Sequence, residues 1–143
     1  HALLRNGCFE EGKLGWAGWN KEKMLSTETS YDGHTSAKML LTRRSQQLNH
    51  ENIMIQGGQT YEIRTAIKTV EATGVVSVQL DWLNSAGKRL RRDTFGSTSG
   101  TTDWVVRTSG ILTAPTGATQ LRLQLRSERG SGSAYFDAVQ LDQ

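Results

Sequence analysis

Short runs in which apolar and polar residues alternate recur along most of the chain. In residues 59–68 every second side chain from Tyr61 to Ile67 suits a core, and the side chains between them are mostly charged. Residues 76–82 and 121–126 repeat this period of two, with Val, Leu and Trp on the apolar side. A period of two is typical of β-strands that bury one face and expose the other. These segments therefore predict strands.

Turn signals separate these runs. Residues 84–88 predict a turn, and residues 89–95 predict the returning strand of a hairpin. Residues 96–102 contain only Gly, Ser and Thr, which is typical of a flexible loop, and residues 134–141 predict the last strand. About eight short strands without an amphipathic helix predict an all-β fold, a two-sheet antiparallel β-sandwich of jelly-roll type. We expect one domain over residues 1–143.

Composition narrows the class of protein. The chain has 143 residues and a single cysteine, Cys8, so no disulfide can form within it, and we expect a buried thiol. No apolar run approaches the roughly 20 residues of a membrane helix, so we expect no membrane association. The formal net charge is +3, and the basic run at residues 88–92 has no series of aromatic residues beside it. We therefore expect no nucleic acid partner.

The sequence offers little that could catalyse a reaction. The three histidines lack the spacing of a zinc site, and the segment from Gly96 to Gly100 has Thr98 where a nucleophile elbow has serine. Glu10 and Glu11 are adjacent, so in a strand their carboxylates would point to opposite faces. We predict no catalytic residue. Carboxylates that converge from distant strands, as in a small lyase or glycosidase, remain an alternative.

Five short motifs carry a resemblance when they are taken in order along the chain. They are residues 6–12 with Gly15-Trp16, residues 32–38, residues 59–61, Asp103-Trp104 before Ala114-Pro115, and residues 135–141. Each motif alone is weak, but the five together are fairly specific. They resemble the carbohydrate-binding modules of families four, nine, sixteen and twenty-two, which are galactose-binding-domain-like jelly rolls.

The resemblance implies a function and a setting. Such modules are non-catalytic and bind a polysaccharide or oligosaccharide. They target a covalently linked catalytic domain, a glycoside hydrolase or polysaccharide lyase, to its glycan. The resemblance also implies a larger, multimodular protein that is extracellular or attached to the cell surface. A structural or interaction β-sandwich of a surface protein, without glycan binding, is the alternative.

The resemblance further implies a structural calcium ion near the paired termini. The matching carboxylates are Glu10 and Asp137, with backbone carbonyl groups near Gly33 and Lys38 as further donors. Hard oxygen ligands of this kind suit Ca²⁺. Glu10 and Asp137 could instead be carboxylates that are solvated or bonded within turns.

Sugar binding needs flat aromatic faces together with amide or charged side chains. Trp16 and Trp104 resemble core tryptophans of the family, and Trp82 shares a side with Val78 and Leu80, so we expect all three in the core. Trp19 and Asn20 lie in a polar stretch, where the family often places a stacking residue. We predict that these two contact the ligand.

Hydrogen bonds to the sugar are expected from the solvated sides of the strands. The predicted binding residues are Arg64, Gln79, Arg92, Arg122, Gln124 and Arg126. This set holds few aromatic residues and unusually many arginines. Because a guanidinium group pairs with carboxylate or sulfate in a fork, an acidic polysaccharide is favoured over plain cellulose.

Overall fold

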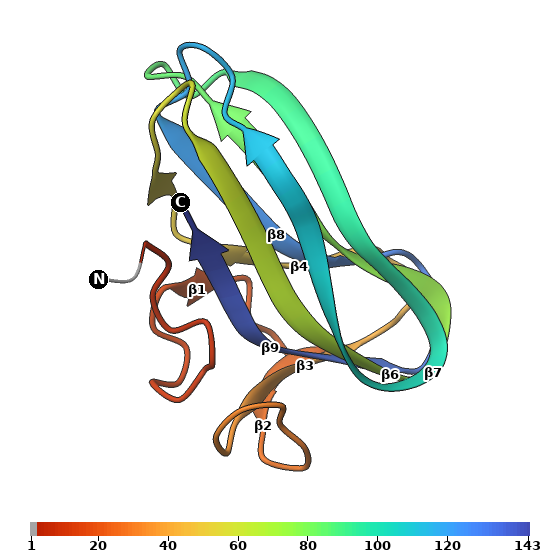
Figure 1. Cartoon of the computed structure of the whole chain (residues 1–143). Coiled ribbons are helices and arrows are strands. Elements are labelled where there is room, and N and C mark those ends of the chain that lie inside the picture. Colours follow the sequence, from red (N-terminus) through yellow and green to blue (C-terminus); the bar gives the residue numbers. More distant parts are fainter. Residues whose placement is uncertain (1–2) are drawn as a thin grey trace.

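The chain folds into strands without a helix in the part that the computed structural model describes, residues 3–143 (Figure 1). No helix that could cross a membrane occurs in this range. The nine strands are β1 (Trp16–Ala17), β2 (Lys23–Ser26), β3 (Ser36–Leu40), β4 (Gln46–His50), β5 (Ile53–Met54), β6 (Thr60–Leu83), β7 (Arg89–Thr113), β8 (Gln120–Ser127) and β9 (Ser133–Asp142).

All strand pairs are antiparallel, and the path β1-β4-β8-β6-β9-β3-β2 folds over into two layers. The first half of β6 pairs with β9, and its second half pairs with β8. β7 follows β6 along its whole length, so this hairpin runs through both layers (Figure 1). We call the layer with β2, β3 and β9 the first layer, and the layer with β1, β4 and β8 the second layer. The predicted antiparallel sandwich is confirmed.

The hairpin bends where its pairing is irregular. The register of β6 and β7 shifts between Thr69, Ala72 and Val76, and Glu71 has a positive φ of 50°. Gly74 lies at the same bend, and a Cβ atom there would be only 2.5 Å from the carbonyl oxygen of Arg129. A residue without a side chain is therefore required where the turning hairpin passes the loop after β8.

The core lies between the two layers and follows the alternation of the sequence. Ile63 and Ile67 in the first half of β6 and Val78 and Leu80 in its second half are fully buried, and Val78 and Leu80 pair with Leu125 and Leu123 of β8 within the second layer. Burial of these branched side chains stabilises each strand's orientation, because a shift of one residue would expose the whole apolar set. The sides expected to face the core are confirmed.

The glycine-rich segment 96–102 is strand and not loop, so that prediction was wrong. Thr98 pairs with Val76, Gly100 with Ala72, and the segment belongs to β7. Gly96 and Gly100 have positive φ values of 79° and 75°, which let the ladder bulge as it turns. Glycine here accommodates the curvature of a long strand.

Candidate functional site

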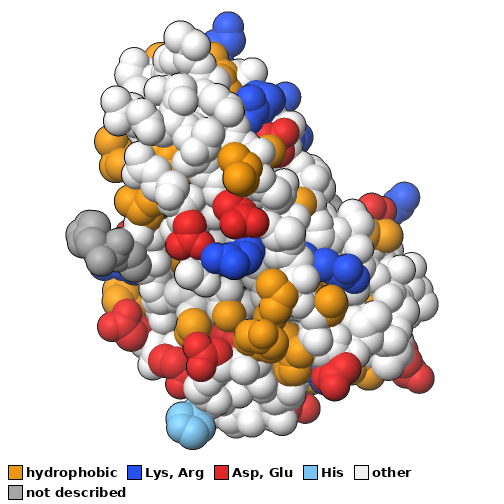
Figure 2. Space-filling model, viewed as in Figure 1, with side chains coloured by type: hydrophobic (Ala, Val, Ile, Leu, Met, Phe, Trp, Pro, Cys, Tyr) orange, Lys and Arg blue, Asp and Glu red, His pale blue; other side chains and the backbone are white. Residues whose placement is uncertain are grey.

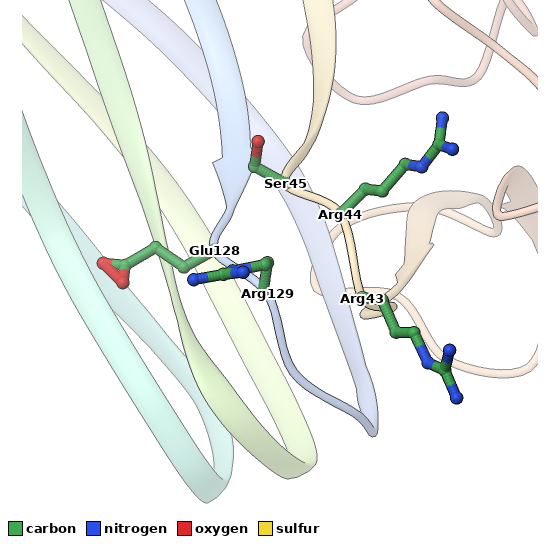
Figure 3. A pocket seen from close by; sticks show the side chains of 5 residues that line it. All are labelled: Arg43, Arg44, Ser45, Glu128 and Arg129. Atoms are coloured by element: carbon green, nitrogen blue, oxygen red, sulfur yellow. The ribbon is translucent and has the colours of Figure 1, made fainter.

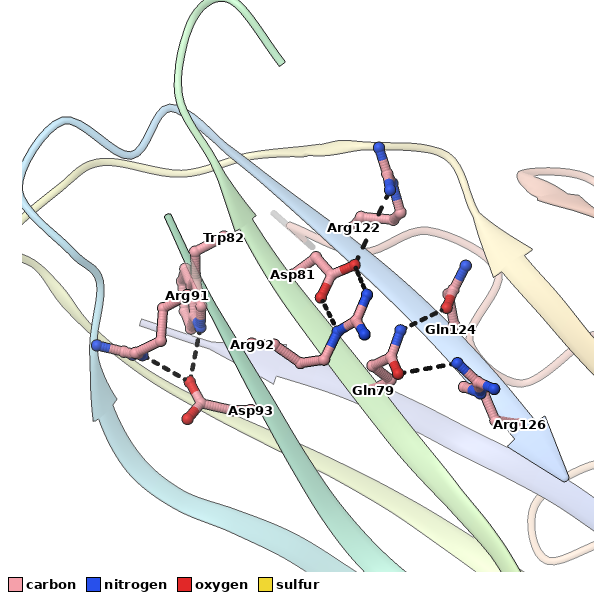
Figure 4. A network of polar contacts seen from close by, with 9 residues as sticks. All are labelled: Gln79, Asp81, Trp82, Arg91, Arg92, Asp93, Arg122, Gln124 and Arg126. Atoms are coloured by element: carbon pink, nitrogen blue, oxygen red, sulfur yellow. Dashed lines mark hydrogen bonds and ion pairs between the residues drawn. The ribbon is translucent and has the colours of Figure 1, made fainter. Parts of the chain in front are cut away.

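The outer surface of the second layer carries a connected set of polar side chains, which we call the polar face. It consists of Gln47 and Asn49 of β4 together with residues drawn in Figure 4, namely Gln79, Asp81, Arg92, Arg122, Gln124 and Arg126. In the register of the strands, Asp81 lies between Arg92 and Arg122, Gln79 is beside Gln124, and Gln124 is beside Asn49. Residues that pair directly across strands share a face, so four strands supply this surface.

Asp81 organises one end of the polar face. Its side chain is 3% exposed, and its two carboxylate oxygens accept hydrogen bonds of 2.7 and 3.1 Å from Nε and Nη2 of Arg92. Nη1 of Arg122 lies 3.9 Å from the same carboxylate. These bonds raise the pKa of Arg92 above its ordinary value. The bidentate pairing fixes the Arg92 guanidinium group, and three arginines against one carboxylate leave the face positive.

Gln79 and Gln124 form the centre of the polar face. Nε2 of Gln79 donates a hydrogen bond of 2.8 Å to Oε1 of Gln124, and Oε1 of Gln79 accepts one of 2.9 Å from Arg126 (Figure 4). Gln79 is 7% exposed, and its amide is held in place on both sides. The network orients the amide group of Gln124, which can present both N–H donors outward.

Asn49 extends this row, and sequence reasoning missed it. It pairs with Gln124, and its Oδ1 atom is buried without a hydrogen-bond partner. A hollow of about 310 Å³ lies beside it, lined by Gly15, Trp16, Ala17, Asn49, His50 and Glu51. The signal was the alternation in residues 46–50, where Gln47 and Asn49 share the side opposite Leu48. An unsatisfied buried acceptor is a group that a ligand hydroxyl can satisfy.

A basic hollow of about 580 Å³ lies where β4 begins and β8 ends, lined by Arg43, Arg44, Ser45, Glu128 and Arg129. In Figure 3 the Arg43 and Arg44 side chains extend away from Arg129. The three guanidinium groups therefore do not converge on one point. They add positive charge at the Arg126 end of the polar face, but they do not form a shaped anion site.

Trp19 and Asn20 lie beyond the edge of the polar face. The Trp19 indole donates a hydrogen bond of 3.2 Å to the carbonyl oxygen of Trp16, and its ring packs edge-on against Phe9 at 6.4 Å. The Nζ atom of Lys13 lies 5.4 Å from the ring centroid. Trp19 is half-buried, while Asn20 is exposed. The structure thus places these two residues apart from the glutamines, across β4 and β1.

The other tryptophans divide between core and surface. Trp16 and Trp82 are 6% and 0% exposed, so their predicted core positions are confirmed. The Trp82 indole donates to Asp93 at 2.8 Å (Figure 4). Trp104 is half-exposed and lies outside the core, so that prediction was wrong. Its ring lies 6.0 Å from the ring of Tyr31, and Trp104 belongs to the half of β7 that pairs with the first half of β6.

Arg64 is separated from the other predicted binding residues. It lies in the first half of β6, on the outer surface of the first layer, where its Nη2 atom is 2.7 Å from Oδ2 of Asp142. Gln79 and Arg92 lie on the outer surface of the opposite layer. The bend in β6 puts the solvated sides of its two halves on opposite surfaces of the sandwich.

Glu10, Gly33 and Asp137 meet around the loop before β3. The carboxylate of Glu10 lies directly against Gly33 and accepts N–H groups from His34 and Thr35. Asp137 is fully buried, and its Oδ2 accepts N–H groups from residues 31 and 32. Lys38 lies inside the β2-β3-β9 ladder, and its ammonium group contacts Glu28 at 2.7 Å.

The donor chemistry of this loop fits a cation. Burial raises the pKa of Asp137, opposed by its three backbone N–H donors, and the Asp32 carboxylate nearby raises it further. Desolvation and the surrounding carboxylates also raise the pKa of Cys8 to about 11. The carboxylates of Glu10, Asp32 and Asp137 around this loop are the hard oxygen donors that Ca²⁺ takes. Within residues 3–143, however, no three His, Cys, Asp or Glu side chains gather as a ready metal site, so carbonyl groups would have to complete the shell.

Comparisons with known proteins place the chain among glycan-binding domains. A family model described as a carbohydrate binding domain matches residues 1–135. A xylanase/beta-glucanase from Ruminococcus flavefaciens is 25% identical over 136 residues, which cover 92% of this chain. The chain spans only 17% of the length of that relative.

Solved structures agree on the fold. A family 16 carbohydrate binding module superposes with a TM-score of 0.79 at 18% identity, covering 99% of both chains. The xylan-binding CBM22-1 domain from Paenibacillus barcinonensis has a TM-score of 0.71 at 18% identity, covering 94% of this chain and 90% of that one. A family 61 module solved with β-1,4-galactotriose has a TM-score of 0.68 at 16% identity, covering 100% and 99%. The match over residues 1–135 and the jelly-roll sandwich together establish that this chain belongs to the carbohydrate binding domain family.

Proposed function

We propose that this chain is a non-catalytic module that binds a glycan on its polar face. The observation that carries the proposal is the hydrogen-bonded row of Gln79, Gln124 and Arg126, whose groups are held in place before any ligand arrives. Sugar hydroxyls are both donors and acceptors, so amide and guanidinium groups in a fixed row can bond several of them at once. Because these side chains are already ordered, little conformational entropy is lost on binding, so hydrogen bonds to uncharged hydroxyl groups suffice for a useful affinity.

The charge of the polar face favours an acidic glycan. Asp81 is bonded by Arg92. The Arg122 side chain is 42% exposed, and Arg126 is half-buried. Arg92 already binds a carboxylate in a bidentate fork, which is the geometry that a uronic acid carboxylate would adopt on a neighbouring guanidinium group. Arg43, Arg44 and Arg129 extend the positive charge beyond Arg126.

The test is a screen of immobilised polysaccharides that sets neutral β-glucans, xylans and mannans beside acidic ones. Replacing both glutamines, Gln79→Ala with Gln124→Ala, should weaken binding at least about tenfold, since two hydrogen-bonding groups are lost. The control is Gln56→Ala, an exposed amide in the loop after β5. Equal binding by the double variant and the wild type, with both folded, would contradict the proposal.

Trp19→Ala belongs in the same screen. Trp19 and Asn20 lie at the edge of the second layer, next to β1. Only a glycan long enough to extend from the polar face past β1 would contact them. We expect Trp19→Ala to weaken the binding of long chains and to leave short oligosaccharides unaffected. A loss for short chains as well would move the centre of the site toward Trp19.

We further infer that the module holds an attached polysaccharide-degrading enzyme on its substrate, outside the cell. Support comes from the xylanase/beta-glucanase relative, in which the matching region is a small part of a longer protein. Holding an enzyme on its polymer raises the local substrate concentration without any new contact to the enzyme. The expected result is faster cleavage of insoluble glycan, and unchanged cleavage of short oligosaccharides, when the module is attached.

A structural Ca²⁺ is proposed at Glu10 and Asp137, with carbonyl oxygens near Gly33 as further ligands. The ion would neutralise the buried Asp137 carboxylate and link the N-terminal segment to β9. Adding Ca²⁺ to chelated protein should raise Tm by several degrees, and Glu10→Gln should abolish the rise. An identical Tm with chelator and with Ca²⁺ would rule the ion out, whatever happens to glycan binding.

A further inference from the structure

The outer surface of the first layer carries a second group of side chains, which we call the aromatic face; Tyr31, Val106 and Gln140 are exposed, while Tyr135 and Ala66 are buried beneath them. It consists of Tyr31, Arg64, Ala66, Trp104, Val106, Tyr135, Ala138 and Gln140. Figure 2 views this side of the molecule and shows hydrophobic side chains gathered next to charged ones. Tyr31 and Val106 are 49% and 48% exposed, which is unusual for large apolar side chains that lie side by side.

A hollow of about 220 Å³ lies within the aromatic face. It is lined by Tyr31, Arg64, Ala66, Val106, Ala138 and Gln140. Ala66 and Ala138 contribute only methyl groups, and Ala138 has a positive φ of 50° at an irregularity of β9. A non-glycine residue in this conformation is uncommon, and here it accompanies the irregular pairing of β6 and β9 at the floor of the hollow. The hollow is smaller than the roughly 300–1,000 Å³ of drug-sized pockets, so it suits one sugar ring.

The aromatic wall of the hollow is held rigidly. The backbone N–H of Tyr31 donates to the buried Asp137 carboxylate at 2.9 Å, and the Trp104 indole donates to Oγ1 of Thr29 at 3.0 Å. The rings of Trp104 and Tyr135 lie 6.5 Å apart, so Trp104 packs between the two tyrosines. The hydrogen bond of the Trp104 indole fixes that ring, and its contact with Tyr31 supports the ring on which a ligand would stack.

Polar groups line the other side of the hollow. Arg64 bonds Asp142 through Nη2, while its Nε atom is buried and has no hydrogen-bond partner. The exposed Gln140 lies beside them, with Nε2 at 3.4 Å from Oδ1 of Asp142. Because Asp142 already neutralises Arg64, this surface favours a neutral ligand, in contrast to the positive polar face.

We propose that the aromatic face is a second glycan site, where a neutral pyranose ring stacks on Tyr31 over Ala66 and Ala138. Its hydroxyl groups bond Arg64 and Gln140. An aromatic wall, a floor of methyl groups and a polar rim match the two chemically different surfaces of a sugar ring. The inference rests on the proposed function in assuming a glycan ligand, but it assigns a different face and a different class of sugar.

The experiment is a titration of the whole chain with neutral β-1,4-linked hexasaccharides of glucose, xylose and galactose. Calorimetry gives the affinity and the number of sites, and the ¹⁵N NMR signal of the Trp104 indole reports on the aromatic face. We expect this signal to shift on saturation. Tyr31→Ala should weaken the binding of the neutral sugar at least about tenfold, through loss of stacking.

Three variants separate the possible outcomes. Gln140→Ala keeps every aromatic ring, so it tests the site even if Tyr31→Ala does not fold; it should weaken binding about threefold to tenfold. Met54→Ala, on the distant β5, is the control for an exposed apolar side chain and should change nothing. The polar-face variant, Gln79→Ala with Gln124→Ala, should leave the neutral sugar bound.

Neutral sugar binding that disappears only in the polar-face variant would overturn this inference and support the proposed function. If no glycan binds saturably, both this inference and the proposed function are overturned. A concentration-dependent dimer that Tyr31→Ala abolishes would instead assign the aromatic face to a second copy of the chain, and would also overturn the inference.

Discussion

The two outer faces of the sandwich are built from the same long hairpin, yet they differ in chemistry. The polar face carries amides and guanidinium groups bonded to one another, and Gln79 and Asp81 are almost fully buried within that network. The aromatic face carries the Tyr31 ring, which is 49% exposed, beside the partly buried ring of Trp104. A polar network selects a ligand by charge and hydrogen bonds, while exposed rings select by stacking. Two modes of sugar recognition can therefore share one small fold.

The largest expected effect comes from disabling both faces at once. On a polysaccharide that contains acidic and neutral sugars, each single-face variant should lose about tenfold in affinity, and the combined variant at least about 100-fold. The two sites lie on opposite layers and share no side chain, so their losses should multiply. The measurement is retention on the insoluble polymer. A combined variant no weaker than the polar-face variant alone would show that only one face binds.

The reactivity of the Cys8 thiol reports on the loop around Asp32, which is adjacent to Tyr31 of the aromatic face. Because the pKa of Cys8 is raised from 9.0 to about 11 in the metal-free protein, the folded, chelator-treated protein at pH 8 should be alkylated about 100-fold more slowly than the urea-unfolded chain. A raised pKa also means that this group stabilises the fold below about pH 9, and that the contribution is lost as pH rises toward 11. Iodoacetamide labelling followed by mass spectrometry measures the rates. Equal rates would mean that the loop around Asp32 is open in solution.

The ion pairs of the two faces should differ in their contribution to stability. Asp81→Ala removes a buried carboxylate and its hydrogen bonds to Arg92, which should lower the free energy of unfolding by about 2 kcal/mol. Asp142→Ala breaks the exposed pair with Arg64 and should have no measurable effect on stability. Urea unfolding compares the two variants. A similar loss for both would mean that the Asp81 network contributes no more than an exposed ion pair.

Salt should affect the two faces unequally. Raising NaCl from about 0.05 M to about 0.5 M should weaken an acidic glycan on the polar face about fivefold, because exposed charges are screened. The neutral sugar on the aromatic face should change by less than about twofold, since Asp142 neutralises Arg64 within the site. Calorimetry at both salt concentrations provides the comparison. Equal sensitivity would show that both ligands occupy the polar face.

Much of the fold could be predicted because alternation is a local property. The period of two in residues 59–68, 76–82 and 121–126 assigns strands and their buried sides without knowledge of their partners. The same logic failed at residues 96–102, where glycine and serine lie within a strand because partners on β6 hold them there. Local composition cannot report a pairing that tertiary structure imposes.

The candidate site was predictable only in part, and for a related reason. Gln79, Gln124 and Arg126 were identified from their solvated positions, and the register brings them together. Arg64 shows the same pattern, but the bend near Glu71 places it on the opposite surface. Asn49 of the polar face, and Tyr31 and Gln140 of the aromatic face, are not among the residues that the sequence predicts.

The sequence by itself determined the strands in residues 59–68, 76–82 and 121–126, where alternation is strict, and which of their sides form the core. The tertiary structure decided which outer face each polar side chain joins, and it placed Trp104 beside Tyr31 on the surface instead of in the core. The physical reason is that alternation specifies which side of each strand faces the core and which faces solvent, but a two-layer sandwich has two outer surfaces. Only the bend of the β6–β7 hairpin and the order of the strands choose between them.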